Sequence, residues 1–245
     1  MDVTVGTGDT VDVFARLMDG NTYDNYGSER APVSFPVTEE LRAMLVASGA
    51  NTINVLMNQL AGERGKRGTL YRTLDDGSVH WCYARLIGIS ARRAITHRTH
   101  LPLTIEFARE TKWYGVSYSI SGALDTSPTT VNLPNYGTAP VTNCIITLNP
   151  GSGSALTGIT ISASTISSFT YTGTVAQNTD LDIDCGAYTV ENNSSDDYAN
   201  FSLDSTHTIA DWLRIQPDGT DVRIDFTGGG DATSSATFNY YESWE

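Results

Sequence analysis

Apolar residues alternate with polar ones along most of this chain, and short turn sequences interrupt the alternation. Leu101, Leu103, Ile105 and Phe107 occupy every second position of one such segment. Alternation with a period of two places one face of an extended strand toward a core and the other toward solvent. The chain is therefore predicted to be mainly β.

The second half of the chain repeats this pattern in short segments. Turn sequences such as Pro217-Asp218-Gly219 separate them. The alternating apolar positions are Cys144/Ile146/Leu148, Ile159/Ile161, Phe169/Tyr171, Leu181/Ile183/Cys185, Val222/Ile224/Phe226 and Phe238/Tyr240. About seven or eight such strands in a domain of this size predict an antiparallel β-sandwich or jelly roll.

The first half contains two segments with helical spacing. Thr38 can cap a helix whose first turn carries Glu39 and Glu40, and Leu41, Met44 and Leu45 follow helical spacing as far as Gly49. Apolar residues from Ile53 to Leu60 repeat that spacing. The sequence therefore predicts a short helical pair over 38–49 and 51–62, after an opening strand at 11–17.

A β-hairpin is predicted next in the chain. Residues 70–74 and 79–89 have strand patterns, and the Asp-Gly step between them supplies the positive φ that a tight turn needs. Two basic segments flank these strands. Residues 62–68 carry too many glycines to continue a helix and are expected to form a flexible basic loop, while 92–100 form a second basic connection.

Composition changes near residue 121, where Pro, Gly, Ser and Thr become frequent. This change predicts an N-terminal domain over 1–126 and a C-terminal domain over 127–245. Residues 1–120 contain 13 Lys+Arg and 13 Asp+Glu, whereas residues 121–245 contain 2 and 15, so the second half holds the whole net charge of −13. Such a surface repels phosphate backbones, and nucleic acid is not expected as a specific partner.

Lys66 and Lys112 are the only lysines among the 15 basic residues. Arginine's planar guanidinium suits bidentate, partly buried ion pairs between protein surfaces better than lysine does. An arginine-weighted first half accordingly favours protein interfaces, although a compositional bias of the genome would produce the same count.

Candidate chemical sites are few. Asp180, Asp182 and Asp184 share one strand face and leave open a weak cation site, but Cys185 occupies the position where a calcium loop requires glycine. His97 and His100 lack a third ligand. No nucleophile motif or phosphate loop occurs, and Cys82, Cys144 and Cys185 lie too far apart in the sequence for a Cys-based zinc motif. We expect buried thiols, no cofactor, no metal and no enzymatic activity.

Aromatic residues gather in the last part of the chain. Trp212 and Trp244 are candidate stacking platforms for sugars, which jelly-roll proteins hold on exposed aromatic rings. Packing within the core is the alternative role for the same residues.

Several segments, in this order, resemble the distal tail proteins of long-tailed bacteriophages. They are 65–78 (GKRGTLYRTLDDGS), 81–86 (WCYARL), 101–107 (LPLTIEF), 113–115 (WYG), 211–219 (DWLRIQPDG) and 240–244 (YYESW). The resemblance implies an N-terminal β domain that forms a hexameric ring continuing the tail tube, and an outward-facing galectin-like or jelly-roll domain.

The same resemblance implies a location in the virion at the tail tip. No run of about 18 apolar residues exists to span a bilayer, so we expect no membrane association and synthesis in the host cytoplasm. The implied partners are other copies of the chain, the tail tube protein and the tip or receptor-binding proteins. The tape-measure protein and DNA would pass through the central channel without specific binding.

The candidate interface residues lie in the two basic segments and the hairpin. They are Arg64, Lys66, Arg67, Arg72, Arg92, Arg93 and Arg98. Each is expected to pair with acids of a neighbouring subunit or of the tube protein. A carbohydrate-binding module and a tail-associated glycan hydrolase are the alternatives from other functional classes.

Overall fold

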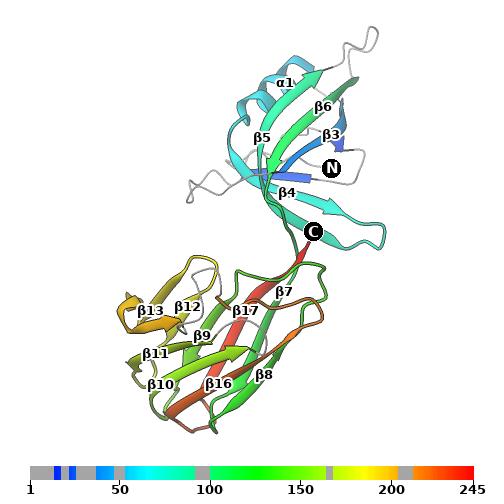
Figure 1. Cartoon of the computed structure of the whole chain (residues 1–245). Helices are drawn as coiled ribbons and strands as arrows, with labels where there is room; N and C mark the ends of the chain where they lie inside the picture. The colour runs from blue at the N-terminus through cyan, green and yellow to red at the C-terminus, as the bar shows by residue number, and fades with distance from the viewer. Residues whose placement is uncertain are drawn as a thin grey trace. The chain divides into compact units, whose positions relative to one another are not determined.

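A computed structural model describes residues 14–17, 22–25, 37–46, 53–91, 100–163, 168–203 and 212–245 (Figure 1). The chain forms two compact units, Met1–Gly115 with Glu245, and Val116–Trp244. The expectation of a mainly β chain with antiparallel sheets is confirmed. The boundary expected after residue 126 stays a prediction.

The first unit is built on one antiparallel sheet with the strand order β1-β3-β6-β5-β4-β2. Its elements are β1 (Phe14–Leu17), β2 (Thr22–Asn25), β3 (Val37–Val46), α1 (Ile53–Gly62), β4 (Arg67–Thr73), β5 (Val79–Ala91) and β6 (His100–Arg109). Leu70, Leu86 and Phe107 are among its buried side chains. The strand predicted at 11–17 corresponds to β1, and 11–13 lie outside the described residues.

The first of the two predicted helices is wrong, because β3 is a strand. It pairs with β6 in ten consecutive positions, from Val37 opposite Arg109 to Val46 opposite His100. Leu41 and Ala43 are buried, while Arg42 between them is exposed. Leu41, Met44 and Leu45 fit a helical spacing as well, but the open edge of β6 decides the outcome, since tertiary context overrides weak local propensity.

The second predicted helix is confirmed as α1, which buries Leu56 and Leu60. The basic loop after it is shorter than expected, since Arg67 and Gly68 already belong to β4. The hairpin is confirmed, with Arg67–Thr73 opposite Val79–Arg85. Gly77 has a φ of 85° at its turn, a left-handed conformation that glycine adopts without strain.

The second unit contains two antiparallel sheets. One has the order β7-β17-β9-β12-β13-β14 and the other β15-β11-β10-β16-β8 (Figure 1). The elements are β7 (Trp113–Ala123, which begins in the first unit), β8 (Thr129–Leu133), β9 (Ile145–Asn149), β10 (Ser154–Ala163), β11 (Ser168–Val175), β12 (Leu181–Asp184), β13 (Thr189–Asn192), β14 (Ser195–Asp196), the 3-10 turn η1 (Tyr198–Asn200), β15 (Phe201–Leu203), β16 (Thr220–Gly229) and β17 (Ser235–Trp244).

Both sheets contribute to one hydrophobic core. Ile146 and Phe238 of the first sheet and Ile161 and Phe169 of the second belong to the same buried cluster. The alternating segments expected from the sequence therefore correspond to β9, β10, β11, β12, β16 and β17. The jelly-roll or galectin-like subtype of this unit stays a prediction.

Candidate assembly surface

The turn between α1 and β4 presents two of the predicted interface residues. Arg64 is exposed, and its Nε donates a hydrogen bond of 2.8 Å to the carbonyl oxygen of Ile87. The Nζ of Lys66 lies 3.0 Å from the Oε1 of Glu63, whose side chain is buried beneath it. Lys66 keeps half of its side chain exposed, so this turn shows solvent a cationic surface.

Arg67 and Arg72 lie differently, because each guanidinium packs on an aromatic ring of the same unit. Arg67 lies 4.0 Å from the ring centroid of Tyr83, and Arg72 lies 4.4 Å from that of Trp113. Arg72 Nη2 is also 3.2 Å from the Nδ1 of buried His80. The contacts of Arg67 with Tyr83 and of Arg72 with Trp113 are cation–π interactions, which stabilise the fold that contains them. The role of both arginines at an interface stays a prediction.

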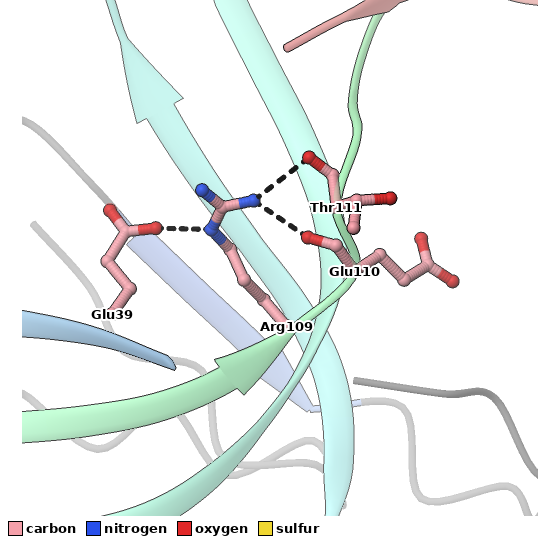
Figure 2. A network of polar contacts seen from close by, with 4 residues as sticks. All are labelled: Glu39, Arg109, Glu110 and Thr111. Carbon is pink, nitrogen blue, oxygen red and sulfur yellow. Dashed lines mark hydrogen bonds and ion pairs between the residues drawn. The ribbon is translucent and has the colours of Figure 1, made fainter. Parts of the chain in front are cut away.

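Arg109 joins Arg67, Arg72, Tyr83 and Trp113 in what we call the aromatic–arginine cluster. No role for Arg109 was predicted from the sequence. Arg109 lies 4.9 Å from the Trp113 ring, so buried Trp113 contacts two guanidinium groups. Figure 2 shows Arg109 pairing with Glu39 and donating to the backbone oxygens of Glu110 at 2.7 Å and Thr111 at 3.4 Å. The sequence did offer one signal for this contact, because Trp113 directly follows the charged segment 109–112.

Burial changes the acid–base properties of this cluster. The pKa of Arg72 is lowered by desolvation first and by the nearby Arg109 charge second. Desolvation also raises the pKa of the Glu110 carboxyl, and it raises the pKa of the Cys82 thiol to about 12. These shifts arise from packing, since a low-dielectric environment disfavours whichever form is charged.

The turn of the β4–β5 hairpin is acidic. Asp75 and Asp76 are exposed, and the Oδ1 of Asp76 accepts hydrogen bonds from the backbone N–H of Ser78 at 2.8 Å and from its hydroxyl at 2.6 Å. Hydrogen bonding by Ser78 lowers the pKa of the Asp76 carboxyl. Leu74 and Val79 flank this turn and are also exposed.

The remaining predicted interface residues belong to the second basic segment. Arg92, Arg93 and Arg98 lie outside the described residues, as does His97. Their assignment to an interface therefore stays a prediction.

Trp212 is not an exposed stacking platform. It is 2% exposed and contacts Phe201, Phe169, Tyr198 and Tyr188, with ring centroids 4.8, 6.3, 6.4 and 5.4 Å away. A sugar needs an open ring face, and these side chains cover Trp212. Trp244 is half-buried at the end of β17.

The acidic strand face of the second unit is held by its own hydrogen bonds. Asp180 accepts a bond of 2.6 Å from Asn149 Nδ2, and Asp182 accepts one of 2.6 Å from the Thr147 hydroxyl. Asp182 also lies directly opposite Glu191, which lies opposite Asp196. These three residues form an acidic row across β12, β13 and β14. Over the described ranges, no group of three His, Cys, Asp or Glu side chains is placed to hold a metal ion.

The three cysteines are buried free thiols, as expected. Cys144 directly precedes β9 and Cys185 directly follows β12, the strand that pairs with β9, and the backbone N–H of Cys185 donates to the carbonyl of Cys144 at 3.0 Å. Burial raises the pKa of both thiols, that of Cys185 to about 12. In the described part of the chain, no helix has the length and hydrophobicity needed to cross a bilayer.

These features define a two-unit, mainly β chain with charged exposed turns and an aromatic–arginine cluster. No family model and no curated protein matches the chain. Among the solved structures that match is the Dit protein (gp 19.1) of phage SPP1, described as a paradigm of the hub adsorption apparatus in phages that infect Gram-positive bacteria. The match covers 100% of this chain and 87% of Dit, at 13% identity and a TM-score of 0.57.

Structures of the phage P2 baseplate in its activated conformation also match over part of their length. The structure with Ca aligns over 83% of this chain and 79% of the matched chain, at 10% identity and a TM-score of 0.44. The structure with Sr aligns over 84% and 79%, at 10% identity and a TM-score of 0.45.

Proposed function

We propose that this chain is a non-enzymatic structural protein of a phage virion, forming a ring at the distal end of a long tail. The observation that carries the proposal is the fold shared with SPP1 Dit over 100% of this chain. A hexamer is the expected ring, with the tail tube protein on one side and the tip or receptor-binding proteins on the other. The tape-measure protein and DNA pass through its channel without specific contacts.

The charge distribution supports this role. A ring requires a heterologous interface, in which two different patches of one chain meet. The first 120 residues carry equal numbers of cationic and anionic side chains, so they can supply both patches. The second half is strongly acidic, which suits an outward module that must stay soluble beside copies of itself.

The buried titratable groups of the first unit have a structural explanation. The buried titratable groups in the first unit, such as Glu63 and Glu110, contact neighbouring side chains or lie in packed surroundings. Desolvation raises the pKa of Glu110, and such a shift arises from structural packing as well as in active sites. The proposal therefore assigns no bond-making or bond-breaking step to this chain.

Microscopy of the purified protein tests the proposal. Negative-stain images should show rings, and light scattering should give about six times the chain mass of 26.5 kDa. Monomers at all protein concentrations would contradict the proposal. Reversing the charges of Arg92 and Arg93 should yield folded monomers, whereas unimpaired rings would remove these two residues from the interface.

A further inference from the structure

The β4–β5 hairpin carries opposite charges at its two ends. The tip surface comprises Leu74, Asp75, Asp76 and Val79, all exposed. The base surface comprises Arg64 and Lys66, which are exposed just before β4 begins. Arg67–Thr73 separates the two surfaces by roughly 20 Å, at about 3.3 Å per strand residue.

The tip surface combines its charges with apolar side chains that its own unit does not cover. Leu74 is 37% exposed and Val79 is 51% exposed, whereas Leu70 further along the same hairpin is fully buried. The turn is well ordered by hydrogen bonds, with Leu74 N–H donating to Ser78 at 2.9 Å and Gly77 N–H donating to Leu74 at 2.9 Å. Aliphatic side chains beside charged ones resemble the centre and rim of a protein interface.

The base surface offers cations to a partner. The bond from Arg64 Nε to Ile87 fixes the guanidinium, and among the described residues no carboxylate forms an ion pair with it. Lys66 pairs with Glu63, and the Lys66 side chain is 50% exposed whereas that of Glu63 is only 4% exposed. An approaching molecule therefore meets the cations first.

We propose that the tip surface of one subunit docks on the base surface of the next. This inference rests on the proposed function and deepens it by naming the two surfaces that meet in the ring. The partner is a second copy, because the tip is acidic and apolar, the base is cationic, and the strand between them keeps the tip from reaching its own base. Contacts between two different patches repeat from subunit to subunit, so they close a ring when the rotation between subunits allows it.

Two complementary variants test the docking. The tip variant D75R/D76N raises the charge of the tip while keeping an oxygen at position 76 that can accept from Ser78. The base variant R64E/K66Q lowers the charge of the base by the same amount and keeps a donor beside Glu63. A control variant D125R/E191Q makes the tip variant's charge change at exposed sites of the second unit.

Each variant alone should stay folded by circular dichroism and elute as monomers, with association weakened by roughly tenfold or more, because attraction at every interface becomes repulsion. The control should form rings. An equimolar mixture of the tip and base variants should restore rings with alternating subunits, because every contact then joins opposite charges.

The outcomes separate this inference from the proposed function. If the unmodified protein forms rings and either variant alone does so equally well, the docking is wrong while the ring remains. If both variants are monomeric and their mixture stays monomeric, the tip and base surfaces do not meet each other. If the unmodified protein never forms rings, the proposed function fails and the docking fails with it.

Discussion

Replacing Trp212 with alanine should destabilise the second unit strongly, because the indole fills part of the core. The side chain is 2% exposed and lies against rings from two strands and the 3-10 turn, with Phe201 nearest at 4.8 Å between centroids. Residues 212–214 belong to no helix or strand, so the position of the indole depends on this packing. Removing the indole leaves a cavity that backbone pairing cannot close.

The magnitude follows from the burial. Deleting a fully buried tryptophan costs about 3–5 kcal/mol, which combines lost transfer free energy with the cavity left behind. A fall of that size in the free energy of unfolding lowers the urea midpoint by roughly 2 M, given a denaturant dependence of about 1–3 kcal/mol per M. Tyr136 provides a matched control, because its ring is 71% exposed in the same unit.

Urea unfolding of the full chain, followed by far-ultraviolet circular dichroism, measures the shift. The Trp212→Ala variant should lose most of the stability of the second unit, and Tyr136→Ala should shift the midpoint by less than about 0.3 M, as surface substitutions generally do. A Trp212→Ala midpoint as close to the unmodified protein as that of the control would refute the burial argument. A sugar-binding role for this ring would then deserve a direct test.

Three further predictions concern close packing, thiols and pH. Gly137→Ala should lower the melting temperature in calorimetry, because a Cβ there would lie 1.9 Å from the backbone oxygen of Ser243. A thiol reagent at neutral pH should leave the native protein unmodified and detect 3 thiols after unfolding, since Cys82 and the other cysteines are buried and burial raises their pKa. NMR titration should give Asp76 a pKa below the usual aspartate value, and Ser78→Ala should raise it.

The pH prediction has a definite sign. Because the folded-state pKa of Asp76 is depressed, its contribution to turn stability is present above the unfolded pKa and disappears as pH falls through the lowered value. An unshifted pKa would show that the bonds to Ser78 are not maintained in solution. Rapid modification of native thiols would contradict their burial, and an unchanged melting temperature for Gly137→Ala would contradict the close approach of the two backbones.

Much of the fold was predictable because both sheets of the second unit obey a simple alternation. Ile146 and Leu148 of one sheet and Ile159 and Ile161 of the other occupy alternate positions, and all four are buried in the shared core. The β4–β5 hairpin was predictable because the Asp-Gly step predicts a tight turn at the point where two strand patterns meet. Local and tertiary preferences point to the same structure in these segments.

The segment at 37–46 shows where such reasoning fails. Its leucines satisfy a helical period and its threonine and glutamates resemble a helix start, yet ten partners on β6 hold it as a strand. A single sequence gives no information about which edge will be open to receive a strand. The register is a property of the assembled sheet.

The candidate surface was predictable only in part. Charge and glycine content predicted an interface role for Arg64 and Lys66, which are exposed, and that role stays a prediction. The same argument included Arg67 and Arg72, whose guanidinium groups pack on aromatic rings. The stacking partner of Arg72 is Trp113, far away in the sequence. Spacing along the chain cannot predict such a contact, because the sheet alone brings these residues together.

The acidic row across β12, β13 and β14 protects the edge of its sheet against pairing with other molecules at high protein concentration. β14 lies at the margin of its sheet, where unpaired backbone groups invite strands from other molecules. Asp182, Glu191 and Asp196 form a row of like charges that reaches this edge at Asp196, and an incoming strand of similar composition would be repelled. Replacing these three acids with their amides would remove this repulsion, so such a variant is expected to aggregate at a lower protein concentration than the unmodified protein.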